Sequence, residues 1–109
     1  MALSKKDFNT LLEMQKLCTQ VENDLEKVTA FRQFMEEAEK RRKALADSYE
    51  KDWLRLIESD DVDDDQYKAV EALVPEGRYS IFAEDTIWNV LSDLHIEYKE
   101  ILKMLVNQL

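Results

Sequence analysis

The 109-residue chain carries 15 Lys and Arg against 24 Asp and Glu, a net charge of −9 that argues against nucleic acid and anionic membranes as partners. Hydrophobic residues make up 45% and charged residues 36% of the chain, a mixture typical of a folded domain rather than a disordered segment. With one Gly and one Pro, the chain lacks the turn residues of a fold built from many short strands. We therefore expect an all-α protein with a single domain over residues 1–109.

The first helix is predicted over residues 5–28. Ser4 can cap its N-terminus, and Asp7 lies where the helix dipole favours an acidic side chain. Apolar positions then recur at intervals of three or four residues, which places them on one stripe of the helix. The stripe comprises Phe8, Leu11, Met14, Cys18, Val21, Leu25 and Val28.

The second helix is predicted over residues 31–58, and its apolar pattern is out of phase with the first. After Val28 the spacing shows two successive three-residue steps, and a new stripe follows. The new stripe comprises Phe31, Met35, Ala38, Arg42, Leu45, Tyr49 and Trp53.

Two architectures explain this shift. In the first, the chain turns between about Asn23 and Ala30, and its helices pack as an antiparallel three-helix bundle with one additional short helix. In the second, one long helix continues through residues 23–31 and pairs with another chain as a coiled-coil dimer. We favour the bundle, because the C-terminal helix matches each half of a folded helical hairpin in length.

The short helix is predicted over residues 64–73, where Asp63 and Gln66 form a capping-box pattern. Pro75 and Gly77 end it, and residues 78–83 are expected to run extended over the bundle. The last helix is predicted over residues 84–108, with Glu84 and Asp85 at the positive end of its dipole.

No motif indicates a catalytic, metal or cofactor site. Asp61, Asp63 and Asp65 match the first ligands of a calcium loop, but Gln66 replaces the required Gly and Ala72 replaces the bidentate Glu. We interpret this run as a solvated loop that caps a helix. The sole histidine and the sole cysteine, His95 and Cys18, suggest packing rather than catalysis or metal binding.

The cellular compartment is predicted to be the cytoplasm. A single cysteine forms no internal disulfide. The first residues lack the apolar core of a signal peptide, and no stretch approaches the roughly 20 apolar residues that span a membrane.

Two segments, residues 48–53 and 79–88, resemble a family of small bacterial helical proteins that is catalogued only as a domain of unknown function. Tyr49, Trp53, Glu84, Asp85 and Trp88 carry the resemblance, which covers the second half of the chain. It implies a bacterial cytoplasmic protein and supplies no activity or substrate.

The sequence predicts a noncatalytic protein-interaction module that binds another protein or a second copy of itself, with a homodimer as one form. Trp and Tyr are frequent interface anchors, which makes Trp53, Tyr79 and Trp88 candidates. The candidate interaction residues are Tyr49, Trp53, Tyr79, Glu84, Asp85 and Trp88. Two alternatives stay open: a small acidic inhibitor or immunity-type protein, and a metal-dependent helical hydrolase that uses clustered carboxylates, such as Glu22 with Glu26 or Glu58 with Asp61.

Overall fold

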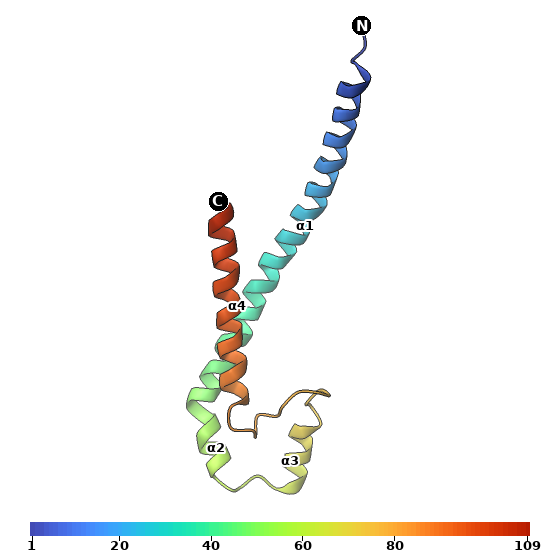
Figure 1. Cartoon of the computed structure of the whole chain (residues 1–109). Helices are drawn as coiled ribbons and strands as arrows, with labels where there is room; N and C mark the ends of the chain where they lie inside the picture. The colour runs from blue at the N-terminus through green and yellow to red at the C-terminus, as the bar shows by residue number, and fades with distance from the viewer. The chain divides into compact units, whose positions relative to one another are not determined.

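The first helix, α1, runs from Lys5 to Ser48 in a computed structural model that describes every residue from Met1 to Leu109 (Figure 1). It begins where the sequence predicts. The backbone N–H of Asp7 donates to Ser4 Oγ at 3.2 Å, and the N–H of Phe8 donates to the Ser4 carbonyl at 2.9 Å. Ser4 therefore satisfies two of the N–H groups that a helix start leaves without partners.

The predicted turn between about Asn23 and Ala30 is absent, because these residues are helical and belong to α1. Each further helical residue adds a backbone hydrogen bond, and no Gly or Pro interrupts the 44 residues of α1. The capping pattern of Asn23 with Glu26 does not outweigh that gain. The separate helices 5–28 and 31–58 were therefore wrong, the three-helix bundle is not confirmed, and the long-helix alternative fits better.

The helical run continues beyond α1 through one wider turn, the π-helical segment η1 (Tyr49–Trp53), and then α2 (Leu54–Glu58). It ends at the predicted residue. Ser59 Oγ donates to the Leu56 carbonyl at 2.7 Å and accepts from the N–H of Asp61 at 3.3 Å. Asp60 adopts a positive φ of 57°, which turns the chain out of the helix.

The short helix α3 (Asp64–Glu71) has the predicted capping box. The N–H of Gln66 donates to Asp63 Oδ1 at 2.8 Å, and the N–H of Asp63 donates to Gln66 Oε1 at 3.1 Å. Beyond α3 the chain turns at Pro75 and Gly77, where Gly77 has a φ of 79° that favours glycine.

The last helix, α4, spans Thr86–Gln108 and so begins two residues later than predicted. Residues 78–83 are not extended throughout, because Ser80 starts a turn. Its carbonyl accepts from the N–H of Ala83 at 3.1 Å, and its Oγ accepts from the N–H of Phe82 at 3.1 Å. This turn places Ile81 and Phe82 against α1, η1 and α3.

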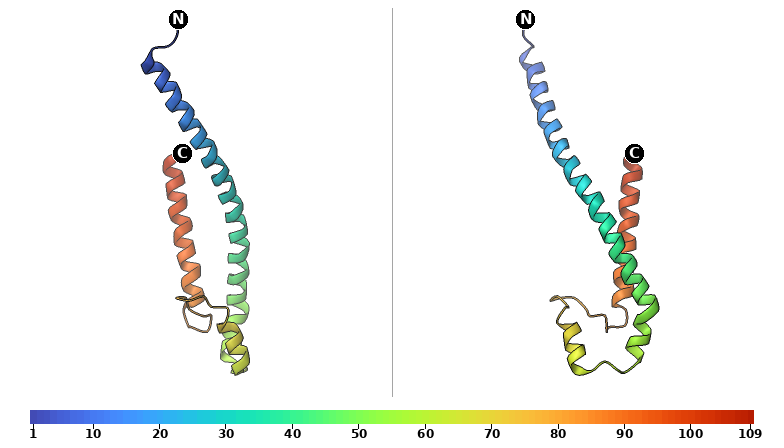
Figure 2. Two further views of the ribbon diagram at one scale, coloured as in Figure 1. Left: turned by 90° about the vertical axis from the view of Figure 1, so that its right-hand side faces the viewer. Right: turned by 180° about the vertical axis from the view of Figure 1, so that it is seen from behind.

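The chain is all-helical, and the contacts divide it into two parts, residues 1–40 and 41–109. In the second part, the helical run from residue 41 to 58 and the beginning of α4 lie side by side (Figures 1 and 2). Ile87 is the buried side chain of this part, and its half-buried apolar neighbours include Leu45, Trp53 and Phe82. Whether the chain forms one domain stays a prediction. None of its helices has the length and apolar character required to cross a membrane.

Candidate protein-interaction surfaces

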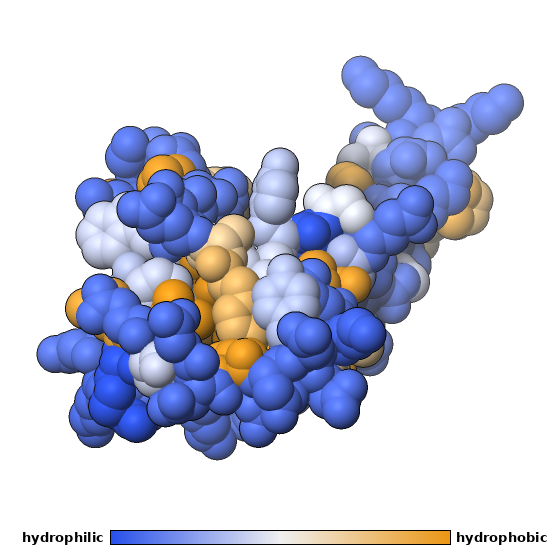
Figure 3. Space-filling model, turned by 90° about the horizontal axis from the view of Figure 1, so that it is seen from below, coloured by the Kyte–Doolittle hydropathy of each residue, from blue (hydrophilic) through white to orange (hydrophobic).

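The second part of the chain contains an apolar hollow of about 370 Å³. Seen from below, apolar side chains gather in the middle and polar side chains surround them (Figure 3). The hollow is open to solvent on one side and is shaped by η1, α2, α3 and the segment before α4. We define it by Leu45, Tyr49, Trp53, Ile57, Val62, Val70, Ile81, Phe82 and Ile87.

Tyr49 and Trp53, two of the predicted interaction residues, help to build the wall of this hollow. The π-helical turn η1 carries both, and their ring centroids lie 5.4 Å apart. The indole Nε1 of Trp53 donates to the Ile81 carbonyl at 2.7 Å, which fastens the segment before α4 to η1. Both side chains are half-buried, so their first role is structural.

Tyr67 of α3 contacts Phe82, a residue that lines the hollow, and this role of Tyr67 was not predicted from the sequence. Its ring stacks on Phe82 with centroids 4.8 Å apart. This contact anchors the segment before α4 to α3. The only signal was the apolar face of α3, where Tyr67 precedes Val70 by three residues.

Trp88 lies on a different surface, and 61% of its side chain is exposed. It borders a shallow depression where η1 and the end of α1 lie against α4. Ile96, two turns further along α4, is 54% exposed. We call this surface the Trp88 face; it comprises Ala46, Tyr49, Glu50, Trp88, Leu91, Ser92, His95 and Ile96.

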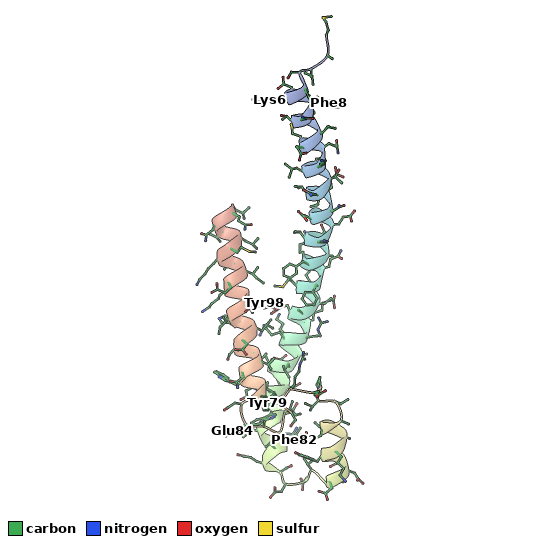
Figure 4. All side chains as sticks on the ribbon, turned by 45° about the vertical axis from the view of Figure 1, so that its right-hand side comes forward. Lys6, Phe8, Tyr79, Phe82, Glu84 and Tyr98 are labelled. Atoms are coloured by element: carbon green, nitrogen blue, oxygen red, sulfur yellow. The ribbon has the colours of Figure 1, made fainter.

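Tyr79, Glu84 and Asp85 form a third group, at the acidic edge of the second part. Tyr79 is 81% exposed, which makes it the most exposed of the four aromatic residues among the predicted interaction residues. It shares a shallow depression with Glu84, Asp85 and Asp93, and Arg78 is the basic residue there (Figure 4). The six predicted residues are therefore spread over the apolar hollow, the Trp88 face and this acidic edge.

The first part of the chain displays the apolar stripe predicted for residues 8–28, and every side chain of that stripe is exposed. Phe8 is 53% exposed and projects from the first turns of α1 (Figure 4). Leu17 flanks the stripe, is 59% exposed and was not assigned to it from the sequence. A shallow groove lies along its middle, lined by Met14, Leu17, Cys18, Val21, Glu22 and Leu25. We call Leu11, Met14, Cys18, Val21, Leu25 and Val28 the N-terminal stripe.

No three His, Cys, Asp or Glu side chains come together in an arrangement that could hold a metal ion. In the acidic run before α3, the carboxylate of Asp63 accepts the helix-capping bond from Gln66. That bond agrees with the interpretation of this run as a cap. The carboxylate pairs proposed for a hydrolase gain no support from the geometry.

No family model, characterised protein or solved structure matches the chain. The resemblance to a bacterial family of unknown function therefore stays a prediction, and the functional argument depends on the surfaces described above.

Proposed function

We propose that this chain is a noncatalytic protein-interaction module whose second part binds another protein. One observation carries the proposal. Ile87, which is 6% exposed, is the only buried residue of the chain, while Trp88, Ile96 and most of the other large apolar side chains are exposed. Contiguous exposed apolar surface is typical of sites that associate with another protein.

The Trp88 face is the proposed contact surface. Trp is the residue most enriched at interface positions that dominate binding, because it buries a large area and loses little conformational freedom. Trp88 and Ile96 lie eight residues apart on α4, so they point to the same side of the helix. The half-buried Tyr49 beneath them is held by its ring contact with Trp53.

The charge of the second part determines the kind of partner. Residues 41–109 contain nine Lys and Arg against sixteen Asp and Glu. A partner with an apolar or aromatic anchor surrounded by Lys and Arg would complement Trp88 and the acidic edge near Tyr79. We expect its association to slow as salt increases, because screening weakens long-range attraction between the surfaces.

Capture by the full-length chain tests this proposal. The immobilised protein is exposed to an extract of its source cells, and bound proteins are quantified against increasing bait. We expect a partner whose binding saturates. The double variant Trp88→Ala/Ile96→Ala should bind it with an affinity at least about tenfold lower, since truncation of an interface anchor costs about 2 kcal/mol or more.

The matched control is Leu102→Ala/Val106→Ala, which removes two equally exposed apolar side chains from α4 outside the Trp88 face. This control should retain the partner. Equal loss in both variants, or no saturable partner at all, would contradict the assignment of the Trp88 face.

A further inference from the structure

We propose that the N-terminal stripe binds a second copy of this chain, with the two α1 helices antiparallel. The inference extends the proposed function by adding an assembly surface to the module. It concerns residues 7–32 of α1 and uses no residue of the Trp88 face.

The stripe follows a heptad pattern through the first part of α1. Leu11, Cys18 and Leu25 are spaced by seven residues, and Met14, Val21 and Val28 form the second seven-residue series. Alternating steps of three and four residues define the contact line of a two-stranded coiled coil. All six side chains are exposed, so the stripe has no apolar partner within the first part of the chain.

Opposite charges occupy the next positions of the same pattern at its two ends. Asp7 lies seven residues before Met14, and Arg32 lies seven residues after Leu25. Neither side chain forms an ion pair or a side-chain hydrogen bond within the chain. In contrast, Glu13 pairs with Lys16 at 3.1 Å and Glu37 with Lys40 at 3.2 Å, all on the outer face of the helix.

These end charges decide the orientation. In a parallel, in-register pair, Asp7 would face Asp7 of the other copy, and Arg32 would face Arg32. Two layers of like charge would then bound the apolar core, which costs free energy. In an antiparallel pair, Asp7 faces Arg32 of the other copy at both ends, and the like-charge contacts become ion pairs.

The same antiparallel register also matches every apolar layer. With Asp7 opposite Arg32, Leu11 lies opposite Val28. Met14 then lies opposite Leu25, and Cys18 lies opposite Val21. Each apolar side chain of the stripe meets another apolar side chain, so one register satisfies the charges and the core together. Beyond Met35 the next two positions of the pattern are Glu39 and Arg42, which ends the apolar contact line.

Charge reversal with analytical ultracentrifugation of the full-length chain, under reducing conditions, tests the proposal. We expect the wild-type protein to sediment at twice its 12.9 kDa chain mass. Asp7→Arg and Arg32→Asp should each raise the dimer Kd by about tenfold or more, because each creates two like-charge contacts per dimer. The double variant Asp7→Arg/Arg32→Asp should return the Kd to within about threefold of wild type.

Matched controls change the net charge equally on the outer face of α1. Glu13→Arg and Lys16→Asp should leave the dimer Kd within about threefold of wild type, because exposed helix pairs contribute little. A wild-type chain that stays monomeric at about 100 µM overturns the proposal. A dimer whose Kd is unchanged by either charge reversal also overturns it. Neither result affects capture by the Trp88 face, so the two proposals fail independently.

Disulfide trapping checks the orientation independently of the charges. In a Cys18→Ser background, chains with Leu11→Cys should cross-link to chains with Val28→Cys when the two are mixed and oxidised. Each variant alone should cross-link at least about tenfold more slowly, because Cys pairs form only where Cα atoms approach within about 7 Å. Rapid cross-linking of the Leu11→Cys variant alone would establish a parallel pair and overturn the proposal.

Discussion

Both halves of the helical run have an apolar face, but only the second face is covered by other segments of the chain. Along residues 8–28, side chains three and four residues apart remain exposed on α1. Along residues 45–57, side chains four residues apart contact α3, α4 and the segment between them; they include Leu45, Tyr49 and Trp53. Periodicity therefore shows which face of a helix is apolar. Whether that face is covered depends on the segments that return to it.

Truncating Ile87, the one buried side chain, should lower the stability of the second part more than any other change described here. Ile87→Ala should lower the free energy of unfolding by about 2–4 kcal/mol, because it loses apolar contacts and leaves a cavity. Urea unfolding followed by far-UV circular dichroism measures the change. Ile96→Ala, the same substitution at an exposed position of α4, should stay within about 0.5 kcal/mol of wild type. Equal effects would show that Ile87 is not the centre of the core.

Detaching the segment before α4 from η1 should have the next largest effect. Trp53→Phe removes the hydrogen bond to the Ile81 carbonyl and leaves that carbonyl without its donor. We expect a loss of about 1–2 kcal/mol in the same unfolding measurement. Trp88→Phe, at the exposed indole, should change stability by less than about 0.5 kcal/mol. A larger effect at Trp88 than at Trp53 would reverse the structural roles described here.

Removing the cap of α3 should produce a smaller loss. Asp63→Ala abolishes the bond from the Gln66 N–H and should cost about 1 kcal/mol, since a capping carboxylate stabilises the helix N-terminus. Asp65→Ala is its control, because Asp65 lies in the first turn but is not the capping residue. That control should cost only about 0.3 kcal/mol through the helix dipole. If the two variants are equal, the acidic run acts through charge alone.

Tyr98→Phe should have the smallest effect on stability, and it should stabilise rather than destabilise the protein. Its hydroxyl is buried and has no hydrogen-bond partner. Tyr98→Phe removes a hydroxyl that is shielded from water and has no hydrogen-bond partner. It should therefore leave the free energy of unfolding unchanged or raise it by about 1 kcal/mol. Tyr79→Phe, at a side chain that is 81% exposed, should have no measurable effect. Destabilisation by Tyr98→Phe would mean that the hydroxyl forms a bond in solution.

The local features that sequence reasoning captured are those that depend on nearby residues. The Ser4 cap, the Asp63–Gln66 capping box and the helix end near residue 58 each follow from side chains within four positions. All-helical structure follows from the scarcity of Gly and Pro. These features need no knowledge of what packs against them.

The misplaced features depend on distant residues. A phase shift after Val28 fits both a turn and a continuous helix that changes its contact face, and spacing alone does not distinguish them. The stacking of Tyr67 on Phe82 joins positions fifteen residues apart through a turn at Ser80. The π-helical turn that aligns Tyr49 with Trp53 has no sequence signature at all.

The hydrogen bond between Trp53 and Ile81 has a spectroscopic consequence. The protein has two tryptophans in different surroundings, one half-buried with its N–H bonded and one largely exposed. A Trp88→Phe chain would keep only the first, and a red shift of its fluorescence would report release of the segment before α4. A Trp53→Phe chain would keep only the second, and a blue shift would report a partner arriving on the Trp88 face. The two natural tryptophans thus distinguish release of the segment before α4 from binding of a partner, without any added dye.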